Sequence, residues 1–164
     1  MNFIDSSATD ASFMENQYLS FIVNEQDYAF PISGVREIIS VQSIMAVPEF
    51  PAYAKGIINV RGDVIPVIDM RLRFHMNEQT YNARTCIIIV NCGSRNIGFI
   101  VDTVSSVIDI APENISPSPR ISGEAAAYIT GVGKIGERII MLLDTDKLLT
   151  DEMMEAVVSG MNNV

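Results

Sequence analysis

The chain has 164 residues and a formal net charge of −9, from 20 acidic and 11 basic side chains. Since 48% of its residues are hydrophobic, it can bury the core of one domain or of two small lobes, which excludes a wholly disordered chain. The acidic balance also excludes binding to nucleic acid, or to an anionic membrane surface, through a basic patch. Six of the acidic residues and none of the basic ones lie in residues 1–16 and 151–164.

The first half of the chain predicts a flexible arm followed by two hairpins. Residues 1–16 are rich in Ser, Ala and Asn, which is typical of a flexible N-terminal arm. Residues 18–32 and 56–69 each place two apolar runs around a polar turn, the pattern of a β-hairpin. Between these hairpins, apolar residues recur at helical spacing and predict a short helix over residues 33–40.

The second half of the chain also consists mainly of predicted strands. Residues 74–84 are polar and predict a loop, and residues 85–101 and 128–143 predict two further hairpins. A short helix is expected after the last hairpin, and residues 151–164 form an acidic, Met-containing C-terminal tail. About nine short strands without a long helix indicate an all-β sandwich or barrel.

Two segments of the chain recur in the same order. Residues 28–39 align with residues 97–108 at an offset of 69, and residues 56–69 align with residues 131–144 at an offset of 75. We therefore predict a duplication that gives two similar small β-barrels within residues 17–150. The boundary between these lobes is expected near residues 74–84, and an exchange of strands between the lobes is left open.

The residues that could carry chemistry lack the context that the chemistry needs. Residues 131–136 spell a dinucleotide fingerprint, but a strand-like run follows where a helix must begin, so these glycines are interpreted as turn residues. Asp144 and Asp146 are interpreted as caps of a short helix rather than as metal ligands. A small hydrolase using His75, the single histidine, is the alternative from a different class. We expect a binding module with no catalytic residue, no metal and no cofactor.

The compartment follows from what the sequence lacks. No apolar run reaches the length of a membrane-spanning helix, and the N-terminus has neither the basic start nor the apolar stretch of a signal peptide. We therefore expect a cytoplasmic protein without direct membrane insertion. In that compartment Cys86 and Cys92 are expected to be reduced.

Residues 56–69, which read G-I-I-N-V-R-G-D-V-I-P-V-I-D, resemble the CheW family of chemotaxis coupling proteins. The mark of that family is an N-x-R-G turn followed by an apolar-Pro-apolar-apolar-Asp strand. The likeness extends, in the family's order, to residues 28–39, 98–107 and 128–133, so it covers about residues 17–149. It implies an all-β fold of two packed SH3-like five-stranded barrels with short helices, and no catalysis.

The resemblance also implies partners. CheW proteins couple the cytoplasmic signalling tips of methyl-accepting chemoreceptors to the regulatory domain of the histidine kinase CheA, and they join other CheW-like domains in rings. The chain is therefore expected to be recruited from the cytoplasm to membrane-bound receptor arrays. Within the same family, the alternative is a coupling protein of a parallel pathway such as type IV pilus motility.

Site residues are carried over from the family position by position. The receptor-binding groove is expected to contain Val35, Val104 and Val107, with burial of all three in the core as the open alternative. Kinase contact is expected at Glu37, Ile38 and Gly56, and the signature turn at Asn59, Arg61 and Gly62. Arg61 either shapes that turn or holds an acidic partner through its donors. Arg36 stands at a position where the family varies, so it is a candidate for tuning receptor choice.

Overall fold

The computed structural model describes residues 15–117 and 125–162, and strands dominate the first of these segments. The strands are β1 (Gln17–Val23), β2 (Gln26–Pro31), β3 (Val35–Ser40), β4 (Ala54–Val60), β5 (Asp63–Asp69), β6 (Cys86–Cys92), β7 (Arg95–Val101), β8 (Thr103–Asp109), β9 (Ile115–Pro117), β10 (Ile129–Ile135) and β11 (Arg138–Leu143). The helices are η1 (Ile32–Gly34), α2 (Met70–Arg73), η2 (Pro112–Asn114), α3 (Ala125–Tyr128), η3 (Thr145–Lys147) and α4 (Asp151–Met161). The predicted all-β class with short helices is confirmed.

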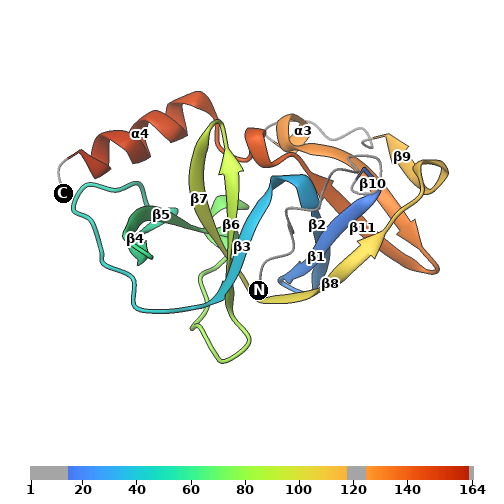
Figure 1. The fold of residues 1–164 in the computed structure, drawn as a ribbon, viewed down its shortest axis with the longest axis horizontal. Helices are drawn as coiled ribbons and strands as arrows, with labels where there is room; N and C mark the ends of the chain where they lie inside the picture. Colours follow the sequence, from blue (N-terminus) through green and yellow to red (C-terminus); the bar gives the residue numbers. More distant parts are fainter. Residues whose placement is uncertain (1–14, 118–124, 163–164) are drawn as a thin grey trace.

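The strands form two sheets, which make two lobes lying side by side (Figure 1). The six-stranded lobe has the order β8-β1-β2-β11-β10-β9, and the five-stranded lobe has the order β3-β6-β7-β5-β4. The chain therefore crosses from one lobe to the other through η1, between β2 and β3, and again at Asp102, between β7 and β8. Residues 74–84, the expected boundary between the lobes, instead join β5 to β6 within the five-stranded lobe.

The predicted duplication is confirmed by strand pairing. In the five-stranded lobe, Val67 of β5 lies opposite Gly98 of β7 in a parallel pair. In the six-stranded lobe, Leu142 of β11 lies opposite Ala29 of β2, also in parallel. Each residue of the second pair is related to its counterpart by the offset that the sequence predicts. β3 and β8 are equivalent in the same way, and each is an edge strand. β3 lies at an edge of the sheet that contains β6 and β7 of the second repeat, and β8 lies at an edge of the sheet that contains β1 and β2 of the first repeat.

The aspartates that end β5 and β11 have equivalent roles. Asp69 accepts hydrogen bonds from the first backbone N–H groups of α2, and Asp144 accepts one from the backbone of η3. The backbone N–H of each aspartate donates to a tyrosine carbonyl, that of Tyr53 for Asp69 and that of Tyr128 for Asp144. The interpretation of Asp144 as a helix cap is confirmed, whereas that of Asp146 is wrong: Asp146 lies inside η3, and its carboxylate accepts a hydrogen bond from the Gly93 N–H.

The helix predicted over residues 33–40 is wrong, because only η1 is helical and β3 follows it. The strand register shifts between Val35 and Glu37, so Arg36 is an extra residue in a β-bulge. A bulge interrupts the alternation of a strand, and Val35 and Ile38 therefore both pack against the same core. The apolar residues at helical spacing, Val35, Ile38 and Ile39, thus lie on a bulged strand.

The largest core lies between the lobes, where aromatic rings from both sheets meet. Phe21 and Phe30 of the six-stranded lobe and Phe99 of the five-stranded lobe are all fully buried. The ring centroids are 4.7 Å apart for Phe21 and Phe30 and 6.2 Å apart for Phe30 and Phe99. Each lobe has a smaller apolar interior of its own. Because the shared core is the largest, each lobe depends on the other for much of its burial.

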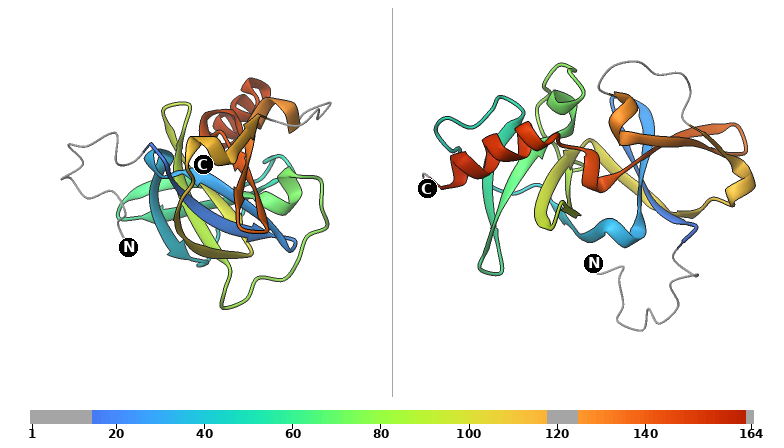
Figure 2. Two further views of the ribbon diagram at one scale, coloured as in Figure 1. Left: turned by 90° about the vertical axis from the view of Figure 1, so that its right-hand side faces the viewer. Right: turned by 90° about the horizontal axis from the view of Figure 1, so that it is seen from above.

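The acidic C-terminal residues include an ordered helix, since α4 packs on the five-stranded lobe (Figures 1 and 2). The Thr150 side chain caps its first turn, and Val157 is fully buried. The three methionines of α4 pack partly buried against the core between the lobes. No helix within residues 15–117 and 125–162 combines the length and the apolar character needed to cross a membrane. Most of the predicted N-terminal arm, residues 1–14, lies outside the described residues.

Candidate docking surfaces

The signature turn is a two-residue hairpin loop between β4 and β5. Val60 pairs with Asp63, which leaves Arg61 and Gly62 as the loop, with φ angles of +51° and +92°. Two successive residues in the left-handed region are typical of the type I′ turn that joins twisted strands. The Asn59 Oδ1 atom accepts a 2.9 Å hydrogen bond from the Gly62 backbone N–H. The turn is therefore explained by local chemistry.

The exposed Arg61 side chain binds Glu37, the residue expected to contact the kinase. Its Nη2 atom lies 2.6 Å and 2.7 Å from the two carboxylate oxygens of Glu37, whose side chain is 17% exposed. Glu37 lies on β3, at one edge of the five-stranded sheet, and Arg61 follows β4, at the other edge. The sheet thus curls until its two edges are joined by an ion pair, as expected of a small barrel.

Gly56 has a structural role that the sequence alone did not reveal. Its φ angle is +148°, and a Cβ atom at this position would lie 2.1 Å from the Met45 carbonyl oxygen. That close approach lets Met45 and Ile57 exchange two backbone hydrogen bonds of 2.9 Å each. Only glycine fits here, so Gly56 positions the segment around Met45 against β4.

An apolar hollow of about 500 Å³ opens beside the signature turn. Its lining includes Met45, which is 64% exposed, and Val64, which is 49% exposed. Exposed apolar side chains gathered at a hollow are typical of a protein docking surface. We call Glu37, Met45, Arg61 and Val64 the β4–β5 face. Sequence reasoning missed Met45 and Val64, since neither differs from the apolar residues around it.

The predicted receptor-binding valines lie at the seam between the lobes but differ in exposure. Val35 is 1% exposed and belongs to the shared core, so it offers no contact surface of its own. Its repeat equivalent Val104 is half-buried on β8, and Val107 on the same strand is 36% exposed. Ile38 on β3, which the resemblance assigns to kinase contact, is the repeat equivalent of Val107; it is half-buried and packs against the shared core, so we group it with these valines. We call Ile38, Val104 and Val107 the seam surface.

Both strands of the seam surface run beside the start of β6. Ser40 of β3 pairs with Cys86 of β6, and the Cys86 thiol donates a 3.3 Å hydrogen bond to the Arg84 carbonyl. Burial raises the pKa of this thiol, whereas the nearby backbone of Val104 on β8 acts in the opposite direction. The start of β8 therefore lies against the five-stranded lobe.

The remaining sequence candidates lie apart from these surfaces. His75 is exposed just after α2, with a φ angle of +62°. Gly131 and Gly133 lie within β10 and pair with β11, so their interpretation as turn residues is wrong; Gly136, with a φ angle of +60°, does lie in the turn between these strands. Among residues 15–117 and 125–162, no group of three or more His, Cys, Asp or Glu side chains is placed to hold a metal ion.

Comparisons with known proteins agree with this geometry. The model of the CheW-like domain family matches residues 17–153. The chain is 35% identical over 142 residues to the chemotaxis protein CheW of Klebsiella aerogenes, covering 86% of each chain. It is 28% identical over 145 residues to protein FrzA of Myxococcus xanthus, covering 87% of this chain and 91% of that one. Among solved structures, the scaffolding protein TtCheW from Thermoanaerobacter tengcongensis superposes with a TM-score of 0.79 at 32% identity, covering 85% of this chain and 96% of that one.

Proposed function

The chain belongs to the CheW family, and we propose that it is a non-catalytic scaffold that couples chemoreceptor cytoplasmic tips to the histidine kinase CheA. The observation that carries the proposal is the presence of two separate exposed apolar surfaces on one pair of lobes that share a core. A coupling protein needs to hold two different partners at once, and separate surfaces allow this.

Receptor tips are proposed to bind at the seam surface. Ile38, Val104 and Val107 offer partly exposed branched side chains from both lobes, which suits the apolar ridge of a helical hairpin. Ser105 on β8 and Arg36 on β3 are exposed polar residues on the same two strands. Polar residues around an apolar centre form the rim of a typical interface. Val35 belongs to the buried core against which Ile38 and Val104 pack.

The regulatory domain of CheA is proposed to bind at the β4–β5 face. Met45 and Val64 supply exposed apolar area, and the Arg61–Glu37 ion pair supplies paired charges at its border. Gly56 contributes by positioning the Met45 segment, so its effect on binding is indirect. All of these residues belong to the five-stranded lobe.

Ring formation with other CheW-like domains is supported by the duplication. Ile139 on β11 is 51% exposed and stands 75 residues after Val64, so it is the repeat equivalent of Val64. Each lobe therefore presents an exposed apolar residue on its equivalent hairpin. A module with a docking residue on each lobe can bind a neighbour on both sides, as a ring requires.

The test is a pair of binding measurements with purified proteins. We expect this chain to bind a soluble receptor-tip hairpin and a CheA regulatory domain in isothermal titration calorimetry. Val107→Lys should abolish receptor binding and leave kinase binding intact, whereas Arg61→Glu should do the reverse. The proposal is overturned if the wild-type chain binds neither partner, or if both variants lose both partners while remaining folded.

A further inference from the structure

In each repeat, the turn of the first hairpin, β1–β2 or β6–β7, donates a backbone hydrogen bond to an aspartate that links its lobe to the other lobe. In the six-stranded lobe, the backbone N–H of Asn24, in the β1–β2 turn, donates a 2.8 Å hydrogen bond to Asp102 Oδ2. Arg71, from α2 of the five-stranded lobe, donates to the same carboxylate from Nε, at 2.9 Å, and from Nη2, at 2.6 Å. Asp102 lies where the chain crosses between the lobes. We call Asn24, Arg71 and Asp102 the first clasp.

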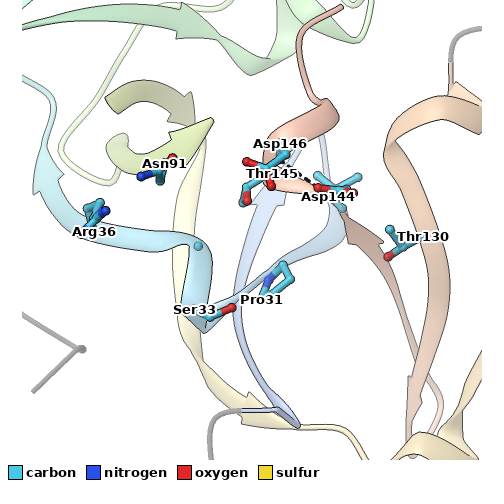
Figure 3. A pocket seen from close by; sticks show the side chains of 10 residues that line it. Pro31, Ser33, Arg36, Asn91, Thr130, Asp144, Thr145 and Asp146 are labelled. Carbon is cyan, nitrogen blue, oxygen red and sulfur yellow. Dashed lines mark hydrogen bonds between the residues drawn. The ribbon is translucent and has the colours of Figure 1, made fainter. Parts of the chain in front are cut away.

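A second clasp stands at the equivalent place in the other half of the molecule. The backbone N–H of Gly93, in the β6–β7 turn, donates a 3.1 Å hydrogen bond to Asp146 Oδ1. Asp146 is held in turn by its own N–H, which donates to Asp144 Oδ1 at 2.9 Å (Figure 3). Gly93 stands 69 residues after Asn24, and Asp146 stands 75 residues after Arg71, so the repeat relates the two clasps.

The two clasps provide a hydrogen-bond acceptor for a turn N–H with different residues. A turn N–H needs an acceptor, and Asp146 supplies one directly. Arg71, the equivalent of Asp146, has only donors, so Asp102 must lie between the arginine and the turn. In the first clasp, Arg71 and Asp102 therefore form a bidentate, charge-assisted ion pair, the strongest common geometry for an ion pair between side chains. Its side chains are only 11% (Arg71) and 30% (Asp102) exposed, so solvent screens it less than a surface pair.

The first clasp also adjoins the seam surface. Asp102 immediately precedes β8, on which Val104 and Val107 lie, and its own N–H donates to the Ile22 carbonyl at 3.0 Å. The start of β8 is thus held between the two lobes. The β4–β5 face, by contrast, lies wholly within the five-stranded lobe and has no part on β8.

We propose that Arg71 and Asp102 are positioning residues, which fix the orientation of the two lobes and so the spacing between Ile38 on β3 and Val107 on β8. This inference rests on the proposed function, because it assigns the clasp to receptor binding. Loosening the clasp weakens receptor binding, which needs both lobes, and spares kinase binding, which needs one.

The test uses Asp102→Asn and Arg71→Gln in the full chain, with Asp27→Asn as the matched control. Asp27 forms a 3.2 Å ion pair with Arg138 between β2 and β11, within one lobe. Residual dipolar couplings of backbone amides measure the orientation of one lobe relative to the other. Calorimetry measures the two affinities. For both clasp variants we expect a rotated lobe and receptor affinity at least about fivefold weaker, with kinase affinity unchanged. The control should change none of these.

The result that overturns the inference is an unchanged lobe orientation together with unchanged receptor affinity in folded clasp variants. A fall in melting temperature alone would assign the clasp to stability only and would likewise overturn it. If the wild-type chain binds no receptor tip, the proposed function fails, but the dipolar couplings still decide whether the clasp sets the lobe orientation.

Discussion

Ser20 in the six-stranded lobe occupies the place that Ile89 occupies in the five-stranded lobe. The two residues are 69 positions apart, and each lies opposite a small residue on the next strand, Ala29 for Ser20 and Gly98 for Ile89. Both side chains are buried, but the Ser20 Oγ atom has no hydrogen-bond partner within the described residues. The interior of the six-stranded lobe therefore carries an unpaired polar group where its counterpart is apolar.

Replacing this hydroxyl should stabilise the protein. An unpaired buried hydroxyl costs about 1–3 kcal/mol, so we expect Ser20→Val to raise the free energy of unfolding by about 1 kcal/mol in urea titrations. Ser20→Ala removes the hydroxyl without adding volume and should be neutral or stabilising. Ser106→Val, at the exposed β8 position opposite Ser20, is the control and should change stability by less than about 0.5 kcal/mol. Lower stability in both Ser20 variants would contradict the prediction.

Lysine substitutions should separate the buried and the exposed seam valines. Val35 is 1% exposed, so Val35→Lys should destabilise the fold by several kcal/mol, because a buried ammonium has no partner there. Val107 is 36% exposed, so Val107→Lys should keep the melting temperature within a few degrees and abolish receptor binding. Thermal unfolding and calorimetry measure the two effects.

Ser106→Lys is the matched control on β8, since it places the same charge on the neighbouring residue, which is exposed. It should keep both the fold and receptor affinity. The assignment of the seam surface would fail if Val107→Lys bound the receptor tip as tightly as this control.

The fold was predictable from sequence where local pattern determines structure. The hairpins and the repeat were found because their turns and apolar runs are contiguous in the chain. The sequence of β3 has the spacing of a helix because the bulge at Arg36 moves Val35 and Ile38 to the same side. A bulge depends on pairing with β6, about 50 residues later, and single-sequence periodicity contains no information on that pairing.

The candidate site was predictable to the same extent. Asn59, Arg61 and Gly62 form a local turn, and their pattern identifies it. The contribution of Met45 depends on a close approach that only Gly56 permits. The first clasp joins residues 24, 71 and 102, which lie in three separate segments. Such long-range contacts leave no periodicity or motif in the sequence, so they required the structure.

Gly56→Ala should reduce kinase binding through the backbone. Because an added Cβ would lie 2.1 Å from the Met45 carbonyl oxygen, the Met45 segment must move away from β4, and the variant should lose about 1–3 kcal/mol of stability. Gly62→Ala is the control, because a Cβ at Gly62 meets no atom within 4 Å although its φ angle is also positive. Amide exchange at Ile57 measures loss of the Met45 pairing, and calorimetry measures kinase affinity. Unaltered protection of Ile57 with reduced kinase affinity would instead indicate direct contact at Gly56.

The ion pair between Asp102 and Arg71 should lose its stabilising effect only in acid. Burial by itself raises the pKa of Asp102, but the hydrogen bonds from Arg71 and from the Asn24 N–H, together with the charge of Arg71, lower it below the ordinary value of 3.8. The unfolded chain therefore takes up a proton on this carboxylate before the folded chain does. The stabilisation is fully present above about pH 5 and declines as the pH falls through the folded pKa.

Asp102→Asn should accordingly destabilise the protein equally from about pH 5 to 8, measured by urea unfolding, and progressively less below about pH 4. In an Arg71→Gln background the same substitution should have a much smaller effect at neutral pH. A loss of stability in Asp102→Asn that stays constant down to the lowest pH at which the protein folds would mean that the carboxylate charge does not hold Asn24, Arg71 and Asp102 together.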